Sequence, residues 1–150
     1  MTDTPTTSRF ALPLLAVAQA QKEVTHNEAL TLLDALVHAA IEAGPLAEPP
    51  SSSAPGQCWI VGSAPTGAWA GHGDAIAVQT SGGWRFAVPR EGTHVMRLAD
   101  GARLRFEGGT WVEPSTIAPP AGGAVIDSEA RGAIAALIAQ LAAQGILISG

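Results

Sequence analysis

Cysteine, tyrosine and lysine are almost or entirely missing from this sequence. Its 150 residues include one cysteine, Cys58, no tyrosine and a single lysine, Lys22. One cysteine cannot form a disulfide within the chain, and no spaced Cys or His partners accompany it as they would in a metal site. We therefore expect a chain that folds in a reducing compartment, with no internal disulfide, no bound metal and no other cofactor.

Long apolar runs and basic clusters are missing as well. No apolar run approaches the roughly 18 to 20 residues that span a bilayer. The N-terminal MTDTPTTSRF also lacks the basic and then apolar layout of a secretory signal. The net charge is -5 and neither end of the chain is basic, whereas affinity for nucleic acid comes mainly from neutralised phosphates. The sequence argues against membrane insertion, signal-peptide export and a nucleic-acid partner.

Large side chains are scarce although apolar residues are plentiful. Apolar residues make up 47% of the sequence but aromatic residues only 5%, because alanine supplies much of the apolar fraction. Each buried residue then removes little apolar area from water, and a thin core usually needs support such as oligomerisation. We expect a folded protein that is stabilised partly by forming a homo-oligomer.

The chain divides into six segments of an α+β protein. Helical periodicity marks both ends, β-leaning runs mark the middle, and stretches rich in Pro, Ser or Gly separate them. The expected segments are an N-terminal segment at 1–24, an N-terminal helix at 25–44, a linker at 45–56, a small antiparallel β-module at 57–113, a second linker at 114–125 and a C-terminal oligomerisation helix at 126–150.

The N-terminal helix has a clear start and stop in the sequence. Thr25 and Glu28 fit the S/T-x-x-E capping box, in which each side chain bonds a backbone N–H of the first turn. Apolar residues then recur at helical spacing, Leu33 and Val37 among them, until Gly44 and a following proline stop the helix. We assign the opposite, solvated side to Asp34, His38 and Glu42.

The middle segment has the pattern of short strands joined by glycine-rich turns. The β-leaning runs are CWIV, AIAVQ, WRFAV, HVMRL and RLRF, and the turns between them include TSGG, ADGA and EGG. The pattern predicts a β-meander or a small barrel.

The C-terminal helix carries an apolar stripe. Asp127 is placed as its N-cap, Glu129 lies in the first turn and Gly145 is placed as its stop. One interpretation lays this helix across the β-module of the same chain. We favour packing between chains, with three-fold symmetry as a hypothesis, because the stripe is followed by further apolar residues in GILIS. The expected oligomerisation residues are Leu33, Val37, Ile134, Leu137, Ile138 and Leu141.

Motifs for catalysis are missing. The four histidines are too scattered for a helical H-x-x-x-H pair, and neither a G-x-S-x-G elbow nor a phosphate-binding loop occurs. GHGD at 71–74 sets an imidazole near a carboxylate, but polar residues flanked by glycine usually form turns. We expect no catalytic residues and no enzymatic activity.

Tryptophans concentrate in the middle segment. Trp59, Trp69, Trp84 and Trp111 all lie there. The favoured interpretation is that these rings form the core, because tryptophan is usually highly buried. The alternative is a carbohydrate-binding surface, in which a ring packs on a sugar and charged side chains bind its hydroxyls. The residues of that surface would be Trp69, Asp74, Trp84, Arg90 and Glu91.

Three stretches together resemble a known family. They are LPLLAVAQAQKEVTHNEAL at 12–30, GQCWIVGSAPTGAWAG at 56–71 and WRFAVPREG at 84–92, and RGAIAALIAQL at 131–141 is similar to the helix that follows this domain. The sequence resembles a phage-associated domain family of unknown function, found among prophage and gene-transfer-agent tail genes. The resemblance implies a structural virion protein, in the form of an intertwined trimeric tail fibre or spike.

The resemblance also implies a location and partners. The protein would be made in the bacterial cytoplasm and placed at the tail tip or capsid surface of a virion or gene-transfer-agent particle, in contact with other tail or capsid proteins. Segment 1–24 would dock on the particle, while the β-module would face the host. The alternatives left open are a carbohydrate-binding module for host surface polysaccharide and, last, a hydrolase. The docking residues would be Gln19, Gln21, Lys22, Asn27 and Glu28.

Overall fold

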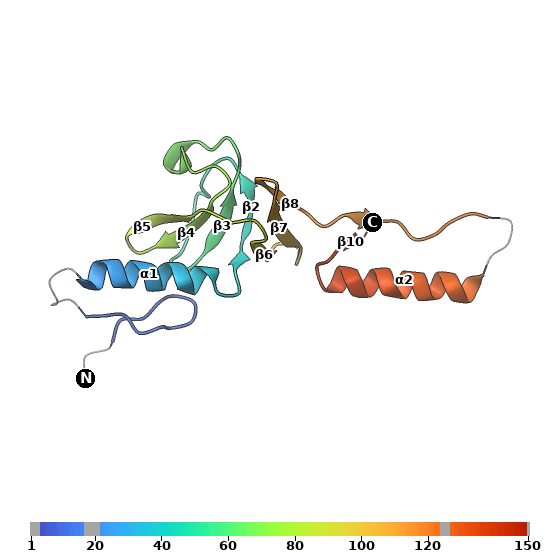
Figure 1. The fold of residues 1–150 in the computed structure, drawn as a ribbon, viewed down its shortest axis with the longest axis horizontal. Coiled ribbons are helices and arrows are strands. Elements are labelled where there is room, and N and C mark those ends of the chain that lie inside the picture. Colours follow the sequence, from blue (N-terminus) through green and yellow to red (C-terminus); the bar gives the residue numbers. More distant parts are fainter. Residues whose placement is uncertain (1–3, 17–21, 124–126, 150) are drawn as a thin grey trace.

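The computed structural model describes residues 4–16, 22–123 and 127–149. It has an N-terminal helix, a small β-sandwich and a C-terminal helix (Figure 1). The elements in chain order are α1 (Lys22–Leu36), β1 (Ala40–Ile41), β2 (Ala43–Leu46), β3 (Cys58–Val61), the 3-10 helix η1 (Gly67–Trp69), β4 (Ile76–Thr80), β5 (Gly83–Ala87), β6 (His94–Arg97), β7 (Arg103–Glu107), β8 (Thr110–Val112), β9 (Thr116–Ile117), α2 (Ser128–Ala143) and β10 (Ile148–Ser149).

The β-module is a sandwich of two four-stranded sheets. One sheet has the order β1-β6-β7-β8 and the other has the order β2-β3-β4-β5. The predicted helix, β-module, helix arrangement is confirmed, and all five β-leaning runs contain a strand. The barrel alternative is wrong, because β1 and β2 begin separate sheets. The module is also mixed instead of purely antiparallel, since β1 pairs parallel with β6 and β2 pairs parallel with β3.

The main core lies between the two sheets and is built by strict alternation. In β3, Cys58 and Ile60 face inward, while Trp59 and Val61 face the outer side of the sheet. A second apolar cluster covers that outer side, so the whole CWIV run is buried. The buried residues of the main core are Ala35, Ile41, Cys58, Ile60, Ile76, Val78, Val95, Ala102, Leu104 and Trp111.

Helix α1 begins and ends earlier than the sequence predicts. The predicted range was 25–44, whereas α1 spans Lys22–Leu36. Thr25 is therefore an exposed residue inside the helix instead of its cap. The chain leaves the helix because Ile41, at 0% exposure in β1, is fully buried between the sheets. Burial of that side chain outweighs the helical pattern of the local sequence.

The N-terminal segment is folded back onto α1 (Figure 1). The Asn27 side chain accepts a hydrogen bond from Leu15 N (2.9 Å) and donates one to Leu15 O (3.0 Å). The Arg9 guanidinium donates to the carbonyls of Asp34 and Ala35, both at 2.8 Å, near the end of the helix. Residues 4–16 are therefore an integral part of the fold.

Asp34 is buried, which corrects its assignment to the solvated side of α1. Its side chain is the acceptor for Thr7 Oγ1, Arg9 N and Phe10 N, each at 2.8 Å. A buried carboxylate is stable only when such partners satisfy it. One helical side chain thus fixes the course of the N-terminal segment.

We expect Asp34→Ala to lower the free energy of unfolding by about 3 kcal/mol, because the substitution leaves buried donors without an acceptor. Urea unfolding followed by circular dichroism measures the effect. The control is Glu107→Ala, which removes an exposed acid paired with Arg105 and should change stability little. Equal effects of the two substitutions would contradict the role given to Asp34.

Helix α2 lies apart from the sandwich and returns toward it (Figure 1). Asp127 is its N-cap, as predicted, and accepts a hydrogen bond from Ala130 N at 2.9 Å. The helix ends just before Gly145, whose φ of 66° suits glycine and allows the predicted stop. Behind it, β10 pairs parallel with β9. Ile138 is the one buried residue among the described side chains of α2, so most of this helix is open to solvent.

The Cys58 thiol is buried at 1% exposure. Burial raises its pKa from an ordinary value of 9.0 to about 11, partly offset by the positive charge of Arg9. In the unfolded chain the thiol ionises at the lower pH, so the folded state loses stability as pH rises from about 9 to about 11.

We expect the free energy of unfolding of the wild type to fall by about 2 kcal/mol more than that of Cys58→Ala between pH 8 and pH 11. Urea titrations at a series of pH values measure this difference. Parallel curves for the two proteins would show that the folded thiol ionises normally.

Candidate binding cleft

A hollow lies on the outer face of the β1-β6-β7-β8 sheet. Leu104 points into the core, so its neighbours Arg103 and Arg105 project outward from β7. The strand register sets Arg105 opposite His94 on one side and Val112 on the other. Side chains directly opposite on neighbouring strands lie within about 5 Å at their Cβ atoms. The sheet thus brings two guanidinium groups and one imidazole to one surface.

The C-terminal end of the chain forms the wall of this hollow. Arg103 N donates a hydrogen bond of 3.0 Å to the carbonyl of Gly145. A side chain on Gly145 would come within 2.3 Å of the carbonyl oxygen of Gly101, so only glycine allows this approach. The cleft has a volume of about 430 Å³. Its lining residues are His94, Arg103, Arg105, Val112, Glu113, Pro114, Ser115, Gly145 and Ile146.

A second hollow of about 340 Å³ adjoins the cleft. It shares His94 and Arg103 with the cleft and adds His38 and Met96 from the same side of the sheet. Both hollows therefore border His94 and Arg103.

Most of the charged side chains near the cleft are paired with a side chain of opposite charge. Arg105 pairs with Glu107 on its own strand. Glu113 receives Arg97 Nη1 at 2.5 Å, and Arg97 also binds Asp100. These two acids raise the pKa of Arg97 above its ordinary range, and Arg97 in turn lowers the pKa of Asp100.

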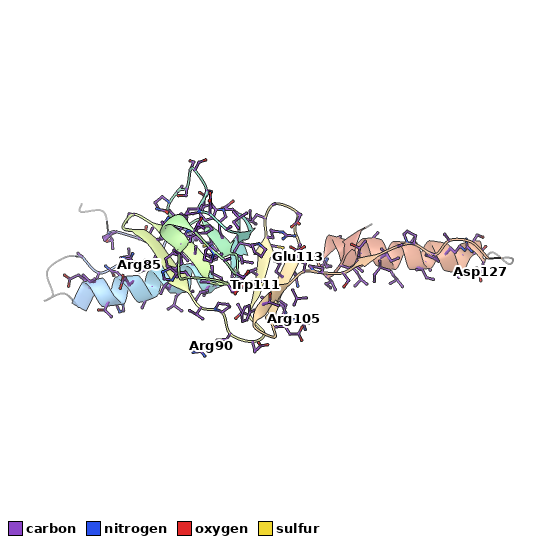
Figure 2. The ribbon with its side chains drawn as sticks, turned by 90° about the horizontal axis from the view of Figure 1, so that it is seen from above. Arg85, Arg90, Arg105, Trp111, Glu113 and Asp127 are labelled. Atoms are coloured by element: carbon purple, nitrogen blue, oxygen red, sulfur yellow. The ribbon has the colours of Figure 1, made fainter. Side chains whose placement is uncertain are left out.

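Arg103 differs from its neighbours in charge pairing. It is exposed, and among residues 4–16, 22–123 and 127–149 no acid forms an ion pair with it. Figure 2 shows Arg105 and Glu113 on the side of the module from which the chain leads to α2. The cleft therefore carries one positive charge that is available to an anion.

The carbohydrate surface expected from the sequence is not assembled as predicted. Trp69 is 0% exposed and makes edge contact with Trp84 at 5.2 Å between ring centroids, so its faces are not open to a sugar. Asp74 is partly buried, and its backbone carbonyl accepts a hydrogen bond from Trp111 Nε1. Trp84 is half-buried. The favoured interpretation, that the rings form the core, is confirmed for Trp59, Trp69 and Trp111.

Arg90 and Glu91 lie on the loop before β6 and do not belong to the apolar cluster that contains Trp69. The Glu91 carboxylate accepts hydrogen bonds from Gly108 N and Gly109 N, both at 3.2 Å, and so holds the β7–β8 turn. Arg90 is exposed. Glu91 therefore has a structural role that its position in the sequence did not reveal.

Two of the expected docking residues form hydrogen bonds within the chain, and the others lie wholly or with their side chain outside the described residues. Gln19, Gln21 and the side chain of Lys22 lie outside the described residues. Asn27 binds Leu15, and Glu28 accepts a hydrogen bond of 2.8 Å from Arg85 Nε. Asn27 and Glu28 thus make contacts within the chain, where the sequence had suggested contacts with a partner.

The expected oligomerisation residues are mostly open to solvent. Five of the six are exposed apolar side chains, and Ile138, at 9% exposure, is the buried one. Those five are Leu33, Val37, Ile134, Leu137 and Leu141.

Side chains that could bind a metal are not clustered in the part of the chain that the structure describes. That part holds no group of three or more His, Cys, Asp or Glu side chains placed to bind a metal. The ring of His72, from the GHGD turn, stacks on Phe86 with 3.6 Å between centroids. Within the same described residues, no helix combines the length and apolarity needed to cross a bilayer.

Sequence analysis missed the cleft because its parts are far apart in the chain. The alternating run Arg103-Leu104-Arg105 already placed two arginines on one face of a strand. Nothing in the sequence showed that Gly145 and Ile146 would close this face, because 40 residues separate them from Arg105.

Comparison with known proteins identifies the family. The family model described as Protein of unknown function (DUF2793) matches residues 26–112, which is more than half of the chain. Among curated proteins no match is found. The matched region runs from α1 to the end of β8 and contains both sheets. The chain therefore belongs to the DUF2793 family of proteins of unknown function.

Proposed function

We propose that this chain is a structural component of a phage-like particle, a homotrimeric tail-fibre or spike protein, or an adaptor, at the tail tip or capsid surface. The proposal draws on the resemblance of its N-terminal and central motifs to a phage-associated family. The observation that carries it is the presence of exposed apolar side chains on both helices, with the sandwich between them (Figure 1). Such surfaces favour contacts with other chains.

The surface of α2 suits self-association. Ile134, Leu137 and Leu141 recur at three- and four-residue spacing and are 44%, 63% and 39% exposed. A single chain leaves these side chains in water, whereas packing three copies of α2 around an axis would bury them.

The surface of α1 suits attachment to the particle. Leu33 and Val37, one helical turn apart, are 52% and 48% exposed, and Phe10 of the folded-back segment is 48% exposed. Docking would thus use an apolar face built by α1 and the segment before it. Other tail or capsid proteins are the partners that this proposal implies.

We expect light scattering of the purified chain to give about three times 15.2 kDa. The double variant Leu137→Glu/Leu141→Glu should be monomeric, because buried unpaired charges in an apolar seam are costly. The control, Ala136→Glu/Ala139→Glu, adds the same charge to exposed positions on the other side of α2 and should remain trimeric. A wild-type protein that is monomeric at micromolar concentration would refute the trimer.

Carbohydrate binding is a second candidate function, with host surface polysaccharide as the ligand. The observation that favours it is the polar cleft of about 430 Å³ beside Arg103, which is within the size range of small-molecule sites, about 300 to 1000 Å³. This function is compatible with a structural role, because three copies of a weak site on one particle strengthen attachment.

A further inference from the structure

We propose that the cleft beside Arg103 binds a carboxylate-bearing sugar unit, such as a uronic acid of an acidic polysaccharide. The proposal rests on the second candidate function and specifies its ligand and its site. It assigns the cleft to the outer face of the β1-β6-β7-β8 sheet, whereas the sequence had suggested the tryptophans near η1.

Arg103 is the anchor for the carboxylate. Its position is fixed, because its backbone pairs with Met96 in β6 and donates to Gly145 O at 3.0 Å. Arg103 lines the cleft and forms no ion pair with any described acid. The planar guanidinium group matches a carboxylate through two parallel hydrogen bonds. Arg105, two residues along the same face, adds positive charge although it also pairs with Glu107.

The acidic side chain of Glu113 in the lining favours a ligand that carries hydroxyl donors as well as a carboxylate. Its Oε1 atom accepts from Arg97, and Arg97 is itself held by the carbonyl of Gly44 at 3.1 Å and by Asp100. The carboxylate of Glu113 is therefore fixed at the rim, with its second oxygen available to a hydroxyl group. A compact anion without a sugar ring, such as phosphate, would meet repulsion from this acid.

The remaining lining suits a sugar ring. Ser115 contributes a hydroxyl group to the lining. His94, which is paired with Arg105 across β6 and β7, contributes ring nitrogens. Val112, Pro114 and Ile146 provide apolar surface for the C–H groups of a sugar. An acidic sugar matches this lining better than a neutral sugar or an inorganic anion does. The arginines suit its carboxylate, the acid suits its hydroxyl groups, and the apolar wall suits its ring.

The site belongs to one chain. All nine lining residues come from the same protomer, so binding does not require the trimer. The test of the cleft can therefore fail or succeed independently of the test of oligomerisation.

Calorimetric titration of the full chain with tetragalacturonate tests the proposal, with cellotetraose and inorganic phosphate as comparison ligands. We expect one tetragalacturonate per chain, with an affinity that falls as sodium chloride is added. Cellotetraose and phosphate should each bind at least about tenfold more weakly, because each lacks one half of the match.

Arg103→Gln should weaken tetragalacturonate binding by about tenfold or more, because it removes the charge-assisted hydrogen bonds. Arg90→Gln is the matched control, since it removes one exposed positive charge from a loop outside the cleft, and it should bind as the wild type does. Leu137→Glu/Leu141→Glu should also bind one ligand per chain with unchanged affinity.

Each contrary result has a distinct meaning. Equal binding by Arg103→Gln and Arg90→Gln would overturn the assignment of the site. Equal affinity for cellotetraose would overturn the acidic specificity but leave carbohydrate binding in place, and equal affinity for phosphate would overturn the sugar as ligand. If neither saccharide binds at millimolar concentration, both this inference and the carbohydrate function are wrong, whereas the structural role in a particle is unaffected.

Discussion

The chain crosses from one sheet to the other within a few residues, and the rest of the fold depends on this crossing. Ile41 in β1 and Ala43 in β2 belong to different sheets although a single residue, Glu42, separates them. Glu42 N donates to Cys58 O at 2.8 Å, and Leu98 N donates to Ile41 O at 2.8 Å, so both sheets are bonded to this short segment. The crossing ends α1, closes the core over Ile41 and sets the relative position of the two sheets.

The same crossing supports the candidate cleft. The carbonyl of Gly44 in β2 accepts from Arg97 Nη1, and this arginine holds Glu113 at the rim of the cleft. The outer face of the β1-β6-β7-β8 sheet holds the cleft, whereas the outer face of the other sheet is covered by the Trp69 cluster. The two outer faces therefore differ in what they can do, because only an uncovered face can present polar side chains to a ligand.

Local patterns predicted those features that depend on neighbouring residues. The five strand-forming runs, the Asp127 cap and the stop at Gly145 follow from alternation, capping and glycine geometry within a few residues. The end of α1 was missed because Ile41 is buried among residues of strands β3 to β8, which come much later in the chain. Asp34 was misassigned because its partners Thr7 and Arg9 precede it by about 25 residues, and an acid on a helix usually faces water.

The sequence by itself determined the class of the fold, the order of its elements, the strand-forming runs and the family, because these depend on local periodicity and on long motifs. Only the tertiary structure decided which tryptophans are buried, which acid holds the N-terminal segment, and which arginine is left without an acidic partner beside a cleft. The physical reason is that burial and charge pairing depend on distances between segments remote in the chain. Such distances exist only after Gly145 has approached Arg103 and the two sheets have packed face to face.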